Sequence, residues 1–104
     1  DCIEFNERFR YSDVACDVAF LAMDLDYHGL DDLSRHFTER FVQVSGDRGL
    51  LDMLNFYKCY RAYVRGKIGL FTANDQSVDE QSHRKCLAGA EQYFRLAMRY
   101  AADQ

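Results

Sequence analysis

The stretch SDVACDVAFLAMDLDYH, residues 12–28, decides the fold of this chain. Its middle, VACDVAFLAM, is apolar nearly all the way round a helix, which is typical of a helix that other helices surround. Ser12 or Asp13 can accept hydrogen bonds from the first turn, and Gly29 is the residue type that ends many helices. We therefore expect a central helix here, and the two carboxylates set into it, Asp13 and Asp17, require an explanation.

Apolar residues at helical spacing predict three further helices, near 31–45, 50–72 and 79–102. The stripes expected to face the core are Leu30, Leu33, Phe37, Phe41 and Val44 in the first, Met53, Tyr57, Tyr60, Val64, Ile68 and Phe71 in the second, and Cys86, Ala90, Tyr93, Ala97 and Tyr100 in the third. Gly66 and Gly69 lie inside a predicted helix, where glycine is costly, so they indicate a bend or a close helix contact.

The chain contains no proline, which favours long uninterrupted helices. The predicted connections are short, so successive helices should lie roughly antiparallel. We expect one all-α domain over residues 1–104, a four-helix bundle-like arrangement. Residues 1–11, which are mostly polar or aromatic, should form an extended or irregular N-terminal arm before the helices of 12–104.

Composition excludes several classes of protein. With 104 residues, 48% of them hydrophobic, the chain is a single folded domain and not a disordered tail. The net charge of −4 argues against nucleic acid as a partner. No apolar run is long enough for a membrane span, and no signal-peptide pattern opens the chain. The cysteines Cys2, Cys16, Cys59 and Cys86 lie far apart, which indicates reduced thiols and a cytoplasmic protein.

Two charged stripes stand out. Asp13, Asp17 and Asp24 form an acidic stripe on the first helix, and Lys58, Arg61 and Arg65 form a basic stripe on the third. The stripes either pair with each other or face water. Asp17 is a separate case, because its sequence neighbours are apolar and a buried carboxylate must accept hydrogen bonds or lose several kcal/mol. We expect its donors to be backbone N–H groups or an Arg from outside the helix.

The residues show no metal site and no complete active site. Asp24, Asp26 and His28 are residue types that bind metals, but positions two apart on a helix do not face each other. His36 and His83 have no partner at ligand spacing. The sequence also has no Gly-rich phosphate loop, nucleophile elbow or catalytic Cys/His pair.

Two segments, DCIEFNERFRYSDVACDVAFLAMDLDYHG (1–29) and NFYKCYRAYVRGK (55–67), closely resemble the aminoglycoside-phosphotransferase-like kinase family of bacteria. The resemblance spans essentially the whole chain, and it is to the branch in which the kinase-like domain precedes a P-loop ATPase module. In that family a strand ends in an Asp that binds the magnesium ions of the nucleotide, and a helix of pattern D-x-x-x-D-hydrophobic-A follows. Asp1 matches the metal-binding Asp, and Asp13 and Asp17 match the helix pattern. The family often has Pro where this chain has Val14.

The resemblance implies that the chain is the helical C-terminal part of a kinase-like domain. The parent would use ATP and Mg²⁺ to phosphorylate a small hydroxylated acceptor. Its nucleotide-binding N-terminal lobe and its catalytic loop of H-G-D-x-x-x-x-N type would then be the missing partners of this chain. Phosphoryl transfer needs nucleotide, metal and acceptor together. We therefore expect these 104 residues alone to be inactive and to hold no cofactor.

The same resemblance assigns roles to the charged residues. Asp17 would accept hydrogen bonds from the backbone of the catalytic loop and anchor it, and Asp13 would cap the helix or join that network. The acceptor side of the site would be lined by Lys58, Arg61 and Arg65. The alternative is that these cations pair with Asp13, Asp24 or Glu4.

A helical binding or interaction module without chemistry is the second functional class that the sequence leaves open. If the chain is part of a larger kinase-like fold, its apolar surface should also be exposed. We then expect a dimer or larger oligomer, or an arm folded back over that surface. The candidate residues are Phe5, Phe9, Tyr11, Val14 and Val18.

Overall fold

The structure, a computed structural model, describes residues 2–47 and 49–103, with the side chains of residues 2–12 left aside. It consists of four helices, α1 (Cys2–Tyr27), α2 (Asp31–Ser45), α3 (Leu50–Ala73) and α4 (Glu80–Ala102). The described ranges contain no strand, so the predicted all-α class is confirmed. The predicted bounds of α2, α3 and α4 agree with the observed ones to within one residue.

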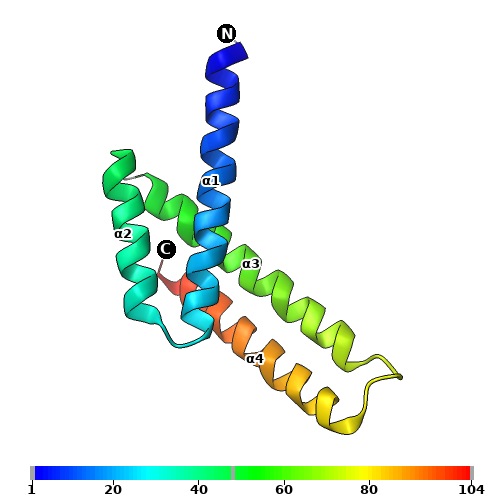
Figure 1. The fold of residues 1–104 in the computed structure, drawn as a ribbon. Coiled ribbons are helices and arrows are strands. Elements are labelled where there is room, and N and C mark those ends of the chain that lie inside the picture. The colour runs from blue at the N-terminus through cyan, green and yellow to red at the C-terminus, as the bar shows by residue number, and fades with distance from the viewer. Residues whose placement is uncertain (1, 48, 104) are drawn as a thin grey trace.

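The N-terminal segment differs from the prediction. Residues 2–11 are helical and continue directly into the central helix, so the expected irregular arm is wrong for these residues. The segment contains no glycine or proline to interrupt a helix. Its polar and aromatic composition had been interpreted as a loop signal. Figure 1 shows these first turns of α1 rising past the other helices. Asp1 lies outside the described residues.

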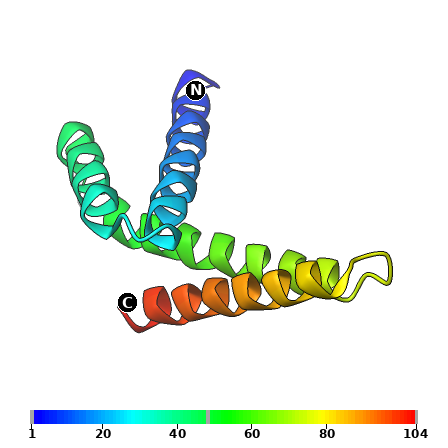
Figure 2. The same ribbon diagram turned by 60° about the horizontal axis from the view of Figure 1, so that its bottom comes forward.

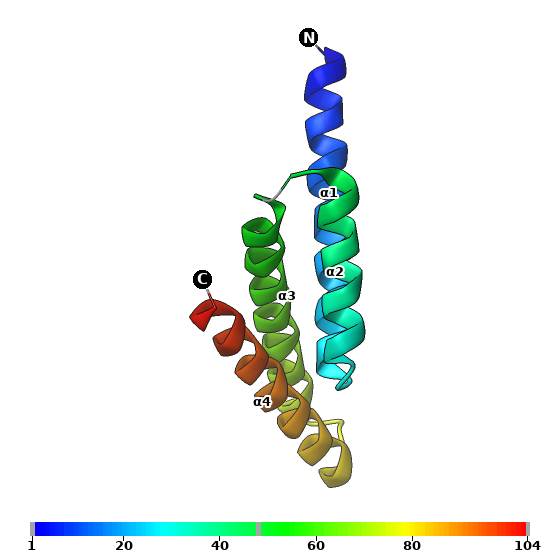
Figure 3. The same ribbon diagram turned by 90° about the vertical axis from the view of Figure 1, so that its left-hand side faces the viewer.

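The helices form two antiparallel hairpins. In Figure 3, α1 and α2 lie side by side, and α3 and α4 form the second pair. Figure 2 shows α1 meeting the N-terminal half of α3, while α4 follows the rest of α3. Within the described residues the backbones of α2 and α4 do not approach each other. The molecule is therefore more open than the bundle we expected, and it extends over 53 × 32 × 20 Å.

Two apolar clusters hold the hairpins together. The first joins Ala15, Val18 and Ala19 of α1 to Leu50 and Leu54 of α3. The second joins Met23 of α1 to Ala62 of α3 and to Leu96, Ala97 and Tyr100 of α4. Small residues supply much of the contact, which lets the helix backbones come close. α1 takes part in both clusters, so the prediction that it is central is confirmed.

The stripe predicted to bury α3 is largely wrong. Met53, Tyr60, Ile68 and Phe71 are exposed. The buried side of α3 is instead Leu50, Leu54, Ala62, Gly66 and Ala73. Because α3 is apolar nearly all round, its periodicity did not show which side would meet other helices. The stripe predicted for α4 is confirmed, because Ala90, Ala97 and Tyr100 are buried and Cys86 and Tyr93 are partly buried.

Helix α2 packs against α1 through small polar residues. Ser34 and Thr38 are buried, and the Ser34 hydroxyl donates a hydrogen bond to the backbone oxygen of Ala22 at 3.0 Å. Phe37 and Phe41 pack beside them as predicted. Three residues of the stripe predicted for α2 are nevertheless exposed: Leu30, Leu33 and Val44. A close approach of two helices therefore displaced the larger apolar residues to the surface.

Glycines end two helices and allow one close contact. Gly29 and Gly46 have φ angles of 78° and 74°, the left-handed conformation in which helices often end. Gly66 lies under the ring of Phe94, and a Cβ atom there would be 2.7 Å from the ring. A methyl group at Gly69 would be 3.1 Å from the Cβ of Ala90. The close helix contact predicted from the last two glycines is thus confirmed.

Candidate functional site

The acidic residues at the start of the central stretch face solvent. Asp13 and Asp17 are exposed, on the side of α1 that also exposes Val14 and Leu21. Neither carboxylate makes an ion pair with any side chain that the structure describes. Asp17 is thus solvated, one of the two states expected where its docking partners are absent, and the other expected state, a local pair with Arg61 or Arg65, is not seen among the described side chains. Val18, named as a candidate for exposed apolar surface, is buried, whereas the side chains of Phe5, Phe9 and Tyr11 lie outside those described.

Arg61 lies next to this acidic face with part of its guanidinium unsatisfied. Its guanidinium carbon is 4.7 Å from the centre of the Phe20 ring, which holds it against α1. The Arg61 Nε is buried and has no hydrogen-bond partner among the described residues. A buried N–H without an acceptor is unfavourable. Arg61 Nε is therefore a donor that a further group, such as a water molecule or another chain segment, can satisfy.

The surroundings of the thiol between the two aspartates disfavour its ionised form. Burial raises the pKa of Cys16 above its usual value, the charges of Asp17 and Asp13 raise it further, and Arg61 opposes them. Because the thiolate is the reactive form of cysteine, a raised pKa lowers the reactivity of this sulfur. The four residues nevertheless act on one another electrostatically, so the Arg61 guanidinium and both carboxylates belong to one region.

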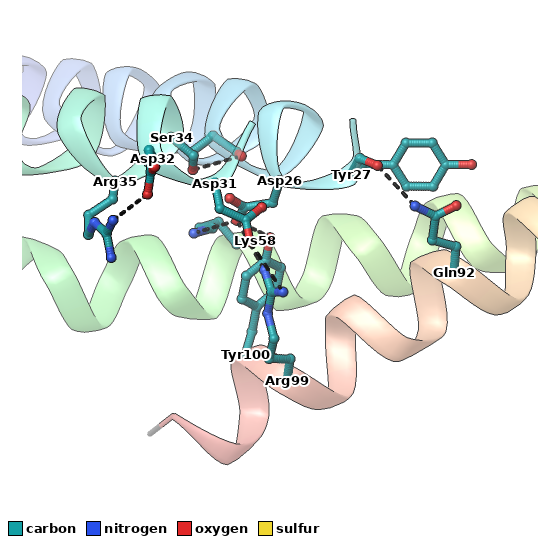
Figure 4. Close-up of polar contacts among 11 residues, drawn as sticks. Asp26, Tyr27, Asp31, Asp32, Ser34, Arg35, Lys58, Gln92, Arg99 and Tyr100 are labelled. Atoms are coloured by element: carbon teal, nitrogen blue, oxygen red, sulfur yellow. Dashed lines mark hydrogen bonds and ion pairs between the residues drawn. The ribbon is translucent and has the colours of Figure 1, made fainter. Parts of the chain in front are cut away.

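A second polar cluster ties three helices together around Asp26 (Figure 4). Lys58 Nζ of α3 lies 3.0 Å from Asp26 Oδ2 at the end of α1, and the Tyr100 hydroxyl of α4 donates to the same oxygen at 2.5 Å. The side chains of Asp26 and Lys58 are only 6% and 12% exposed. Arg99 reaches from α4 to Asp26 at 3.9 Å and to Asp31 at 3.7 Å.

This cluster is structural. Burial, then the hydrogen bond and charge of Asp26, raise the pKa of Tyr100 far above its usual range, so the phenol remains a neutral donor. Lys58 pairs with Asp26 and lies over the Tyr100 ring at 4.5 Å. The Lys58 ammonium therefore has its partners within the fold. The sequence interpretation missed Asp26, although a carboxylate at a helix C-terminus, where the dipole disfavours it, was a usable signal.

Arg65, the third residue of the basic stripe, lies beside Tyr93 of α4. The guanidinium carbon of Arg65 lies 5.5 Å from the centre of the Tyr93 ring, and the interaction with this side chain is the main factor that raises the pKa of Arg65. Tyr93 in turn stacks on Tyr27 with ring centres 4.0 Å apart. These residues line a pocket of about 290 Å³ between α3 and α4. The structure thus divides the basic stripe: Lys58 joins Asp26, Arg61 joins Phe20 and Arg65 joins Tyr93.

Two of the histidines contact the backbone. His28 and His83 contact the backbone oxygens of Asp24 and Ala73 through Nδ1. Among the described side chains, no three potential metal ligands come together. No helix over the described ranges has the length and apolar character needed to cross a membrane.

Comparisons with known proteins find similarity to uncharacterized proteins. No family model matches the chain, and no solved structure gives a significant match. Three uncharacterized mycobacterial proteins are similar to it, Rv2004c and MT2060 of Mycobacterium tuberculosis and Mb2027c of Mycobacterium bovis. Each is 44% identical over 68 residues, which make up 65% of this chain and 14% of the relative. The matched part of the chain thus spans a small fraction of the length of these relatives.

Proposed function

We propose that the chain is the substrate-side helical part of an ATP-dependent small-molecule phosphotransferase of the aminoglycoside-phosphotransferase-like family, inactive by itself and working in the cytoplasm. The observation that carries the proposal is the exposed pair Asp13 and Asp17 beside the unsatisfied Nε of Arg61. Acceptors and a donor side by side, with apolar residues around them, suit the docking of an additional backbone segment.

In this proposal, the α1 face receives the catalytic loop. The Asp17 carboxylate accepts backbone N–H groups of the loop, and Arg61 Nε donates to one of its carbonyl oxygens. Asp13 and Asp17 do no chemistry, and they fix the position of the residues that do. Val14 and Leu21, which are exposed on the same side of α1, supply the apolar part of the contact.

The basic residues then have separate roles. Arg65 remains available to the acceptor side, whereas Arg61 contacts the docked loop and Lys58 supports the wall of the site through its pair with Asp26. A nucleotide-bound magnesium ion would neutralise charge on the transferred phosphate. Asp1 would be one of its ligands by resemblance to the family, and the others would come from the missing lobe and loop.

The length of the similar proteins supports the same proposal. The similar mycobacterial proteins are much longer than this chain, so a segment of this kind occurs within larger polypeptides. A longer polypeptide can supply the N-terminal lobe and the catalytic loop that the proposed reaction needs.

The test is the turnover of that longer polypeptide with Asp17→Ala. Removing the carboxylate leaves loop donors unpaired at about 1–3 kcal/mol each, which corresponds to roughly 5- to 150-fold in rate. Nucleotide affinity should change much less. Asp32→Ala is the matched control, because Asp32 is an exposed aspartate on α2, away from this face. If Asp17→Ala and the milder Asp17→Asn leave both turnover and melting temperature unchanged, the anchoring role is wrong.

A helical interaction module is the second candidate function. The observation that favours it is the row of exposed aromatic residues along α3, because a surface of that kind usually meets a partner. The sequence that precedes Asp1 in the longer polypeptide separates the two candidates. A run of H-G-D-x-H-x-x-N type about 15–25 residues upstream favours the kinase, and its absence favours the module.

A further inference from the structure

Helix α3 exposes an apolar face that one lysine, Lys67, interrupts. Its exposed residues at helical spacing are Met53, Phe56, Tyr60, Tyr63, Leu70 and Phe71, called here the outer face of α3. The four aromatic side chains Phe56, Tyr60, Tyr63 and Phe71 are 58%, 57%, 51% and 73% exposed. Their spacing places them within about one quarter to one third of the helix circumference, at 100° per residue.

The aromatic part of this face is comparable in area to the largest apolar patch of an ordinary monomer. An aromatic side chain offers about 200 Å², so the four leave roughly 450–500 Å² in contact with water. The largest apolar patch on an ordinary monomer is about 300–600 Å² and is often functional. Met53 and flanking residues add to this area, and the contact would lie at the small end of specific interfaces, to which each partner contributes about 800 Å².

The outer face carries one acid and one base in a symmetric position. Asp52 lies at its N-terminal edge, and Lys67 lies within it near the other end. Both residues are exposed, and neither makes an ion pair with a described side chain. If a second α3 lies antiparallel on the first, the acid of each copy can lie opposite the base of the other.

The same register pairs the aromatic residues. The midpoint between positions 52 and 67 is also the midpoint between positions 56 and 63. A two-fold axis there, between Cys59 and Tyr60, places Phe56 opposite the partner's Tyr63 and Tyr60 close to the partner's Tyr60. One register therefore matches both the charges and the rings, which is the self-complementarity that a two-fold interface requires.

We propose that two copies of this chain associate through an antiparallel α3–α3 contact on the outer face, with Asp52 of each copy paired with Lys67 of the other. Leu70 and Phe71 lie beyond the helix overlap and form its rim. The contact does not involve the docking face on α1, because Arg61 projects from the opposite side of α3, where it meets Phe20. The dimer and the proposed phosphotransferase role are thus independent inferences.

Charge reversal tests the register. The dissociation constant of the chain is measured by sedimentation equilibrium, and far-UV circular dichroism confirms that each variant is folded. Asp52→Lys or Lys67→Glu alone should weaken the dimer about tenfold or more, because the symmetry sets like charges together at two places. The double variant Asp52→Lys/Lys67→Glu restores both pairs and should return to within about threefold of the wild type. Glu39→Lys, on the exposed side of α2, is the matched control and should change nothing.

Two results overturn the proposal. The first is a folded chain that stays monomeric up to about 200 µM, where even weak specific dimers are populated; the outer face would then belong to another part of a longer polypeptide. The second is a dimer that the single reversals do not weaken, or that the double reversal does not restore, because association would then use another surface or another register.

Discussion

Replacing Asp26 by Ala should be among the most damaging single changes in this chain. Asp26 accepts from Lys58 at 3.0 Å and from Tyr100 at 2.5 Å, and its side chain is 6% exposed. In the variant, the Lys58 ammonium stays in a site where it is 12% exposed but has lost its counter-charge. Breaking a buried pair in this way costs about 3–5 kcal/mol. The whole free energy of unfolding of a domain of this size is about 5–15 kcal/mol.

Matched variants distinguish the stability lost with the buried pair from that lost with an exposed charge. Asp32→Ala removes an acid whose ion pair with Arg35 is exposed, with side chains 94% and 66% accessible, so it should cost at most about 1 kcal/mol. Asp26→Ala combined with Lys58→Met leaves neither charge unpaired and should recover part of the loss.

The assay is urea denaturation followed by circular dichroism at neutral pH, with the free energy of unfolding extrapolated to water. Two outcomes would refute the reasoning: an Asp26→Ala loss no larger than that of Asp32→Ala, or a double variant that is less stable than Asp26→Ala alone.

Two further predictions concern pH. Burial and Asp26 raise the pKa of Tyr100 in the folded chain. The native phenol therefore stays protonated, while the phenol of the unfolded chain ionises above about pH 10. The free energy of unfolding should therefore fall as the pH rises beyond that value. Tyr100→Phe should be slightly less stable near neutrality and show a flatter alkaline loss in urea midpoints, and an unchanged slope would count against this. Asp79 caps α4, and hydrogen bonds from the backbone and side chain of Ser82 lower the pKa of its carboxyl group. The contribution of this carboxylate to the free energy of unfolding is therefore present above about pH 4 and is lost as the pH falls below that value. Asp79→Ala should lower the melting temperature at pH 7 more than near pH 2, whereas Asp79→Asn, which keeps a capping oxygen, should change it less.

Local chemistry made the helix ends predictable. Gly29 and Gly46 follow α1 and α2 in the left-handed conformation, which glycine adopts without strain and which ends many helices, so these ends depend on the local chain alone. The interpretation of residues 2–11 as an arm was wrong because it weighed polar composition above the absence of any helix breaker.

Tertiary contacts were harder to foresee. Helix α3 is apolar all round, so the exposed positions of Met53, Tyr60 and Phe71 follow only from where α1 and α4 lie. The Asp26 cluster joins residues from three helices that are far apart in the sequence, and no local pattern links them. The apolar neighbours of Asp17 suggested burial in the parent, yet in this chain Val18 and Ala19 are buried while Asp17 and Leu21 are exposed on another side of α1.

The most direct test of the proposed function is the transfer of labelled γ-phosphate from ATP to small hydroxylated acceptors by the longer polypeptide that contains this chain. We predict magnesium-dependent transfer that Asp1→Ala abolishes and Asp17→Ala reduces, and neither transfer nor tight ATP binding by the 104 residues alone. Failure of the longer polypeptide to label any member of a broad acceptor panel, or full activity with Asp1→Ala, would contradict the proposal.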